Sequence, residues 1–438
     1  MLAGQIGDYN KNKPACLCPR MTLASRFPEA SDSERRGARH AGVDHEGVTL
    51  TTFDLTSIPF FRPSLGDDEI AAVTECLRSG WLTTGPKCAA FENAFAARIG
   101  DDVEAVAVNS ATAALHLGLE AMGVGPGDEV IVPTLTFTAT AEVVRYLGAT
   151  PVMVDVEADT LCIDPAAAEA AITERTKVIM PVHFAGRMCD MTALRALADR
   201  HGLKILDDAA HALPAHHRGR PVGNCGADAT AFSFYANKTM TTGEGGMLVT
   251  ANPELAARAR VMRLHGIDRD VFNRFTDKRA SWFYDVIAPG FKYNLTDIAA
   301  AIGLVQLGRV DDFVRIRTER VARYNSAFAD LPVILPPGPA EGDRHSWHLY
   351  ILQLSDRAPL ARDDFIRALQ SAGIGVSVHY RPLHQMTLWK RFTEGRAFPN
   401  ADRIFTRCVS LPLFMSMTDA EQDRVIEVVR DVLGGAAA

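Results

Sequence analysis

The sequence predicts an α/β protein built on a mainly parallel β-sheet. Two observations lead to this prediction: short, continuously apolar segments that are typical of buried strands, and segments between several of them that carry apolar residues at helical spacing. The length of 438 residues, with 47% hydrophobic and 23% charged residues, is typical of a globular protein of two or three domains. Ligands on such sheets bind at the carboxyl ends of the strands.

The predicted elements follow in chain order. A helix at 67–80 has its apolar residues at helical spacing and ends in glycine. Further helices are predicted at 111–124, 138–148 and 191–202. The strands that alternate with them are predicted at 103–110, 128–133, 150–156, 177–184, 203–209, 229–234 and 245–250. Two long helices follow, at 296–310 and 315–331.

The last part of the chain predicts a smaller α+β unit, which begins after the Pro/Gly-rich stretch 336–343. We therefore predict a large domain at 49–325 and a small C-terminal domain at 326–438. Residues 1–48 show little periodicity and no apolar signal-peptide core, which predicts a disordered N-terminal extension. Within the small unit we expect strands at 348–354 and 375–380 and helices at 361–373 and 419–433.

Composition and charge argue against several classes of partner. The net charge is −7 and no Lys/Arg run stands out, so nucleic acid is not an expected partner. No stretch of about 18 apolar residues predicts a membrane span. The eight cysteines are scattered and the thirteen histidines lack metal-ligand spacing. We therefore predict a cytoplasmic protein with free thiols and no metal.

Lys238 lies between two segments that both resemble buried strands, 229–234 and 245–250. Ser233 precedes it by five residues, so in a strand-then-turn geometry both side chains can reach one ligand. A lysine held out of water has a lowered pKa and becomes a nucleophile at neutral pH. The alternative is a solvated turn lysine, which the flanking strands and the glycines of "GEGG" disfavour.

Two further stretches place polar residues where a strand ends. In "VNSATAALHL" a helix starts at Ala111 and Thr112, where open backbone N–H groups and a hydroxyl suit a phosphate; alternatively, Ser110 and Thr112 only cap the helix. In "KILDDAAHALPA" Asp207 and Asp208 end a strand and His211 follows. A carboxylate is costly there unless it meets a cation; the alternative is an N-cap aspartate with a surface histidine.

Phe137 opens a helix directly after another strand, in "PTLTFTATAE", where it either packs in the core or stacks on a planar cofactor. Because the carboxyl ends of parallel strands meet at one edge, these stretches predict a single pocket with a phosphate cradle, an aromatic ring, a carboxylate and a reactive lysine. Pyridoxal 5′-phosphate (PLP) chemistry requires such groups: a lysine Schiff base and an acid on the pyridine nitrogen.

Ordered blocks over residues 57–435 resemble the DegT/DnrJ/StrS family of nucleotide-sugar aminotransferases. Within the family the pattern is most similar to the UDP-4-amino-4-deoxy-L-arabinose aminotransferases of lipid A modification. The resemblance implies PLP-dependent transferase fold type I, with a mainly parallel seven-stranded sheet in the large domain and a smaller C-terminal α+β domain. The matching blocks are "SGWLTTGP", "NSATAALHL", "PTLTFTAT", "GATPVMVDVE", "PVHFAG", "DDAAHA", "FSFYANKTMTTGEGGM", "PGFKYNLTDIAAAIG" and "SVHYRPLH".

The resemblance also implies residue roles by matching position. Lys238 would bind the cofactor covalently and shuttle protons, Asp208 would pair with the pyridine nitrogen, and His211 would lie near the ring hydroxyl. Members are typically homodimers with shared active sites, so Asn294 would reach the neighbour's phosphate; Lys292 competes with it for this position. The other cofactor contacts would come from Ser110, Ala111, Thr112, Ser233 and Phe137, and the sugar-nucleotide contacts, where packing is the alternative, from Trp81, Thr84, His379, His384 and Lys292.

The implied reaction moves the amino group of L-glutamate to a nucleotide-linked 4-keto sugar. It yields a 4-amino-4-deoxy sugar nucleotide and 2-oxoglutarate, for cell-surface polysaccharide or lipid A modification. Alternatives are a same-fold PLP sugar dehydratase, a 3-keto-sugar aminotransferase and a non-catalytic regulatory member. Family members that act as dehydratases carry histidine in place of the lysine, so Lys238 favours amino transfer. A nicotinamide-dependent enzyme is disfavoured, because "GEGGM" precedes a strand rather than a helix.

Overall fold

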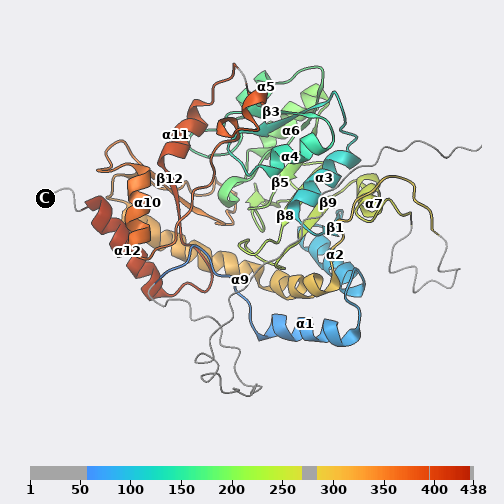
Figure 1. The fold of residues 1–438 in the computed structure, drawn as a ribbon, viewed down its shortest axis with the longest axis horizontal. Helices are drawn as coiled ribbons and strands as arrows, with labels where there is room; N and C mark the ends of the chain where they lie inside the picture. The colour runs from blue at the N-terminus through green and yellow to red at the C-terminus, as the bar shows by residue number, and fades with distance from the viewer. Residues whose placement is uncertain (1–56, 269–283, 394, 435–438) are drawn as a thin grey trace, which may run out of the picture. The chain divides into compact units, whose positions relative to one another are not determined.

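The computed structural model describes residues 57–268, 284–393 and 395–434. The predicted disordered extension at 1–48 lies outside the described residues. Residues 54–438 cluster as one compact unit, and the description below concerns its described part. Figure 1 labels its helices and strands in chain order.

A seven-stranded sheet forms the centre of this unit, in the order β1-β9-β8-β5-β4-β2-β3 (Figure 1). Strand β9 is antiparallel to both of its neighbours, and the other neighbouring pairs are parallel. The predicted fold class, with a mainly parallel sheet of seven strands, is confirmed. The strands are β1 (Glu104–Val108), β2 (Glu129–Pro133), β3 (Thr150–Val154), β4 (Thr176–Ile179), β5 (Lys204–Asp208), β8 (Ala229–Ser233) and β9 (Gly246–Thr250).

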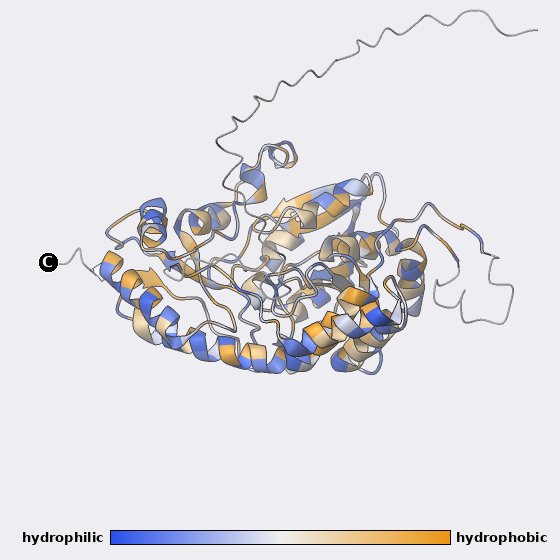
Figure 2. Ribbon diagram, turned by 60° about the horizontal axis from the view of Figure 1, so that its bottom comes forward, coloured by the Kyte–Doolittle hydropathy of each residue, from blue (hydrophilic) through white to orange (hydrophobic). Residues whose placement is uncertain are grey.

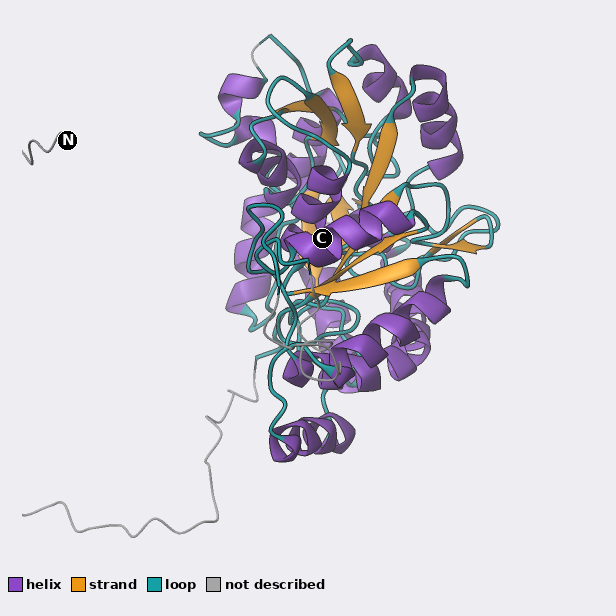
Figure 3. Ribbon diagram, turned by 90° about the vertical axis from the view of Figure 1, so that its right-hand side faces the viewer, coloured by secondary structure: helices purple, strands orange, loops and turns teal. Residues whose placement is uncertain are grey.

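Helices lie on both sides of these strands (Figure 3). The strands are therefore buried along almost their whole length, which explains why they are continuously apolar in sequence. The covering helices are α2 (Pro86–Ile99), α3 (Ala111–Ala121), α4 (Ala139–Tyr146), α5 (Pro165–Ala170), α6 (Met191–His201) and α7 (Pro253–Met262).

One long helix, α9 (Asp297–Phe328), replaces the two helices predicted at 296–310 and 315–331. The prediction of a break was wrong because Val310, Phe313 and Val314 are all buried and continue the helical spacing across it. Figure 2 shows apolar and polar residues alternating along this helix. It packs against α1 (Asp67–Ser79), α2 and α12 (Asp419–Gly434).

The C-terminal part has a second hydrophobic core and a three-stranded antiparallel sheet. The strand predicted at 375–380 is wrong: Ser377 forms a single bridge with Ser410, and the chain then leaves the sheet. Because α9 runs through the boundary predicted between the domains, that division stays a prediction. The elements are β10 (Val333–Ile334), β11 (Tyr350–Leu354), β12 (Cys408–Leu411), α10 (Arg362–Ser371) and α11 (Pro399–Arg407).

Candidate active site

A cavity of about 490 Å³ opens at the carboxyl ends of the parallel strands, and we call it the Lys238 pocket. Strand β9 runs in the opposite direction, so its first residues also reach this edge. The pocket brings together many of the residues predicted from the sequence: Ser110, Ala111, Thr112, Phe137, Asp208, His211, Ser233, Lys238 and His379.

Lys238 lies in a turn directly after β8, where its backbone N–H donates a hydrogen bond to the Tyr235 carbonyl at 3.0 Å. The pKa of its amine is lowered to about 8, because burial disfavours the charged form; the charge of Asp208 offsets part of this effect. About a tenth of the amine is therefore unprotonated at pH 7, far more than for an ordinary lysine. Such an amine can act as a nucleophile and as a base.

Asp208 ends β5 and is 6% exposed. Burial raises its pKa, but hydrogen bonds to both carboxylate oxygens favour the ionised form: Ala210 N–H donates to Oδ1 at 3.1 Å and the Thr140 hydroxyl donates to Oδ2 at 2.9 Å. The preceding Asp207 points to the opposite face of the strand, where it pairs with His183 at 3.3 Å. Only the second of the two aspartates therefore faces the pocket.

The beginning of α3 closes one end of the Lys238 pocket. The Ser110 hydroxyl accepts a hydrogen bond from Ala113 N–H at 3.1 Å, so the helix cap considered from the sequence is present. Gly246 lies against this turn, since a Cβ at 246 would lie 2.5 Å from the carbonyl carbon of Ser110. Glycine therefore allows β9 to approach the helix N-terminus closely, next to the pocket-lining Ala111 and Thr112.

His211, which follows β5, and Tyr380, which comes from the C-terminal part, form one wall of the pocket. The Tyr380 hydroxyl lies 3.1 Å from His211 Nε2. Burial, with the nearby charge of Lys238, holds the pKa of His211 well below its ordinary value, so its imidazole is neutral. Phe137 is 57% exposed, and its ring centroid lies 5.9 Å from that of Tyr380. An exposed aromatic ring at the pocket wall offers a surface for stacking.

Several predicted site residues lie outside the lining of the Lys238 pocket. Asn294 donates to the Thr84 hydroxyl at 2.7 Å and accepts a hydrogen bond from Lys292 Nζ at 2.6 Å. The Trp81 indole N–H donates to the Thr84 carbonyl at 3.2 Å. These four residues form a separate cluster beside the beginning of α9, which we call the Asn294 cluster. Their predicted roles stay predictions.

His379 and His384 have different positions. His379 lines the pocket, and its Nδ1 shares a hydrogen bond with the Ser410 hydroxyl at 2.7 Å. His384 does not line it: its ring bridges Thr134 and Asp402, each at 2.8 Å. This arrangement favours a packing role for His384, the alternative that the sequence left open.

Sequence reasoning missed Tyr380 and Thr140. Tyr380 lies within "SVHYRPLH", where the neighbouring His379 was selected instead. Thr140 lies within "PTLTFTATAE", and it is fully buried between the Asp208 carboxylate and the Thr136 hydroxyl, 2.8 Å away. The signal available in the sequence was that Thr140 and Tyr380 are polar residues within blocks that already contained a predicted site residue.

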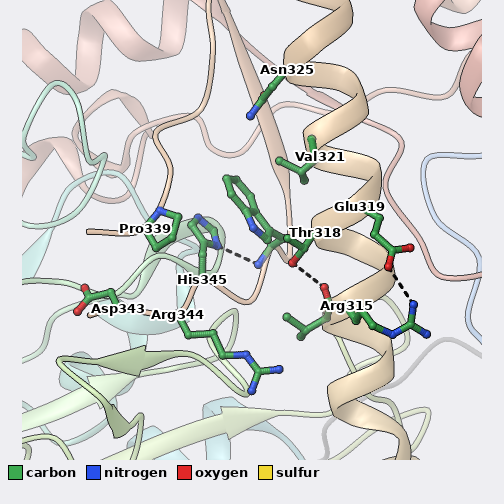
Figure 4. A pocket seen from close by; sticks show the side chains of 12 residues that line it. Arg315, Thr318, Glu319, Val321, Asn325, Pro339, Asp343, Arg344 and His345 are labelled. Carbon is green, nitrogen blue, oxygen red and sulfur yellow. Dashed lines mark hydrogen bonds and ion pairs between the residues drawn. The ribbon is translucent and has the colours of Figure 1, made fainter. Parts of the chain in front are cut away.

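A second cavity of about 470 Å³, which we call the α9 cavity, lies between α9 and residues 339–347 (Figure 4). Trp347 and His345 stack there with ring centroids 3.9 Å apart. Arg315 and Glu319 form an ion pair at 2.9 Å on its helical side. No residue predicted for the active site lines this cavity.

Among the residues that the structure describes, no group of three His, Cys, Asp or Glu side chains is arranged to hold a metal ion. No helix in the described ranges is long and apolar enough to cross a membrane.

The seven-stranded sheet and its helices have the fold of PLP-dependent aminotransferases. The chain belongs to the DegT/DnrJ/EryC1/StrS aminotransferase family, whose sequence profile matches residues 63–430. This confirms the family that the ordered sequence blocks indicated.

Named relatives agree with this membership. The spore coat polysaccharide biosynthesis protein SpsC of Bacillus subtilis (strain 168) is 49% identical over 383 residues, covering 86% of this chain and 98% of that protein. Spr1654 from Streptococcus pneumoniae, assigned as a sugar aminotransferase, is 38% identical to this chain in each of two solved structures. Its PMP form has a TM-score of 0.81 and covers 86% of this chain and 99% of its own. Its PLP form has a TM-score of 0.80 and covers 87% of this chain and 100% of its own. The aminotransferase TlmJ from Streptoalloteichus hindustanus is 33% identical, with a TM-score of 0.80 over 87% of this chain and 100% of that chain.

Proposed function

We propose that the protein uses PLP to move the amino group of L-glutamate to the keto carbon of a nucleotide-linked 4-keto sugar. The products are 2-oxoglutarate and a 4-amino-4-deoxy sugar nucleotide. The observation that carries the proposal is the Lys238 amine, with its pKa lowered to about 8, in one cavity with the buried Asp208 carboxylate. Family membership and the relatives named for sugar amino transfer and polysaccharide biosynthesis support a sugar as the substrate.

The finer features of the substrate rest on the sequence resemblance alone. The 4-keto position, the nucleotide and glutamate follow from similarity to the UDP-4-amino-4-deoxy-L-arabinose aminotransferases, notably at "SGWLTTGPK", "PVMVDVEADTL" and "PGFKYNLTDI". The biological outcome in this proposal is the modification of a cell-surface polysaccharide or of lipid A. A cytoplasmic location, expected from the cysteine pattern, stays a prediction.

The residues of the Lys238 pocket fit PLP. Ser110, Ala111 and Thr112, together with Ser233, would bind its phosphate where Gly246 permits close backbone approach. Asp208 would accept a hydrogen bond from the pyridine N–H, Phe137 would stack on the ring, and Lys238 would hold the cofactor covalently. When bound, PLP withdraws electrons from the carbon that carries the amino group and makes its proton acidic.

Lys238 would transfer protons at both substrates. Once a substrate amine displaces it, its free Nζ would remove the proton from the α-carbon of glutamate and would give a proton to the cofactor carbon that receives the amino group. The same Nζ runs these transfers in reverse on the sugar, with its pKa near 8 suited to both the acid and the base role. The two substrates then react in turn, which predicts ping-pong kinetics.

A second copy of the chain would complete the site. In this proposal Asn294 contacts the phosphate bound by the neighbouring subunit. Two observations support it: Asn294 does not line the Lys238 pocket of its own chain, and its side chain is held in place by Thr84 and Lys292. Shared active sites in a homodimer therefore agree with the position of the Asn294 cluster.

The test is turnover by the purified protein. Glutamate should bleach the visible absorbance of the bound cofactor, and one of the UDP-, GDP- or dTDP-linked 4-keto sugars should then gain an amino group, detected by mass spectrometry. Amination of a 3-keto sugar, or loss of water from the sugar, would replace the proposal by one of its same-fold alternatives. A protein that binds no PLP and turns over none of these sugars would favour the regulatory alternative.

A further inference from the structure

A hydrogen bond joins His211 and Tyr380, and the surroundings of His211 indicate which of the two residues donates it. The Tyr380 hydroxyl and His211 Nε2 lie 3.1 Å apart, and both residues line the Lys238 pocket. Either atom could donate the proton, because a phenol can donate and accept and a neutral imidazole carries one N–H and one bare nitrogen. The other imidazole nitrogen decides between these two arrangements.

Nδ1 of His211 is buried, and no described residue forms a hydrogen bond with it. If its proton were on Nδ1, a buried N–H would have no partner among the described residues. If the proton is on Nε2, the buried atom is a bare acceptor, which native structures tolerate better than an orphaned donor. Nε2–H therefore donates to the Tyr380 oxygen, and the hydroxyl proton of Tyr380 is left for another acceptor.

The surroundings of Tyr380 in the described residues offer no such acceptor. Its ring lies beside Phe137 and Phe184, at centroid distances of 5.9 and 6.1 Å, and His211 is its hydrogen-bond partner among the described residues. Because Tyr380 lines the cavity, its hydroxyl proton is available to a molecule bound there.

Neighbouring residues hold His211 in place beside Tyr380. The Ser346 hydroxyl donates to the His211 carbonyl at 2.6 Å, and the ring of His348 lies 4.3 Å from the His211 ring. Gly186, at φ +97°, permits this close packing, since a Cβ there would lie 2.1 Å from the Ser346 hydroxyl oxygen. The backbone of His211 is therefore fixed, and its imidazole packs against the ring of His348.

We infer that Tyr380 is a specificity-determining residue whose hydroxyl donates a hydrogen bond to an oxygen of the bound substrate. The inference rests on the proposed function. Both kinds of substrate carry suitable oxygens. The amino acid and its keto acid each have a carboxylate, and the sugar has keto or hydroxyl oxygens. The shared chemistry is an uncharged donor facing an acceptor oxygen.

The test compares Tyr380→Phe with Tyr146→Phe in the cofactor-loaded enzyme. Tyr146 is an exposed tyrosine on α4, outside the pocket, with its hydroxyl on Glu142 at 3.3 Å. One arm measures 2-oxoglutarate binding to the aldehyde form by calorimetry, and the other measures binding of the nucleotide amino sugar to the amine form, because neither of these pairs can transfer an amino group. Tyr380→Phe should weaken at least one of them by about tenfold, as expected for one lost hydrogen bond, and Tyr146→Phe neither.

The affected arm identifies the substrate that receives the hydrogen bond, and weakening in both arms means that both substrates place an oxygen there. Equal affinities for wild type and Tyr380→Phe in both arms would overturn the inference while the proposed function stands. A wild-type protein without PLP or amino transfer would instead overturn the proposed function.

Neutron diffraction of the deuterated wild type tests the inferred direction even if Tyr380→Phe does not fold. Deuterium on Nε2 of His211 is expected, and deuterium on Nδ1 would overturn the inference.

Discussion

The Lys238 pocket and the α9 cavity are almost equal in volume, about 490 and 470 Å³, but they differ in how their charged groups are balanced. In the Lys238 pocket, the amine of Lys238 and the carboxylate of Asp208 are both buried, which lowers the pKa of the amine and raises the pKa of the carboxyl group. In the α9 cavity, Arg315 pairs with the exposed Glu319, and Arg344 pairs with Asp311 at 2.9 Å.

The difference shows that volume alone does not mark a functional site. His345 in the α9 cavity also has a shifted pKa, lowered to about 3 by burial, but its Nδ1 accepts a hydrogen bond from Trp347 N–H, so its neutral form is satisfied. By contrast, the Lys238 pocket combines shifted pKa values with polar groups that face open space. That combination is typical of catalytic sites.

Lys238→Ala should have the largest effect of any single change. It removes the amine that would hold the cofactor and move the protons, so we expect activity to fall by at least about a thousandfold. The visible absorbance of the bound cofactor should disappear in the same variant. Steady-state assays and an absorbance spectrum measure both effects.

Lys204→Ala is the matched control, because Lys204 is an exposed lysine at the beginning of β5. It should keep wild-type activity and absorbance. Turnover by Lys238→Ala at the wild-type rate would show that the pocket contributes no more chemistry than the α9 cavity.

The two neighbouring aspartates should separate activity from stability. Asp208→Asn should reduce activity by roughly a hundredfold, since an amide cannot stabilise a protonated ring nitrogen, with little loss of folding stability. Asp207→Asn should lower the free energy of unfolding by about 1–3 kcal/mol, because it weakens a buried contact with His183, while activity is kept. Kinetic assays and urea unfolding of both variants test this, and the opposite pattern would contradict the assignment.

The sequence was sufficient to predict the sheet and the residues at its strand ends. Continuous apolar strands can only be buried on both faces, and parallel strands bring their ends to one edge. Asp208 and Ser233 could therefore be placed beside Lys238 before any coordinates were known. Alternation along β5 places Asp207 and Asp208 on opposite faces, and the family resemblance indicated that Asp208 is the one in the pocket.

Loop geometry limited the rest of the prediction. Whether His379 or Tyr380 faces His211 depends on where the chain leaves its bridge at Ser377, which no periodicity in the sequence records. The Asn294 cluster likewise depends on a contact between residues more than two hundred positions apart, since Asn294 bonds to Thr84. Long-range contacts of single side chains leave no local sequence pattern.

The pH dependence of stability offers a smaller, graded test. Folding lowers the pKa of Lys238 from 10.5 to about 8, so between these values the unfolded chain binds a proton that the folded chain lacks. The stability of the cofactor-free protein should therefore rise with pH across this window, relative to Lys238→Met. Urea unfolding of both proteins at pH 7 to 10 measures the difference. A difference that is constant with pH would contradict the lowered pKa.

Arg315→Gln should have the smallest effect, and it tests the other side of the comparison. Arg315 and Glu319 are one turn apart on the exposed side of α9, and both remain hydrated when the pair is broken. Melting temperature, kcat and KM should therefore all equal the wild-type values within error. A raised KM for the nucleotide sugar would mean that the α9 cavity takes part in substrate binding. In that case charge balance would not distinguish the two cavities, and the argument that assigns function to the Lys238 pocket alone would fail.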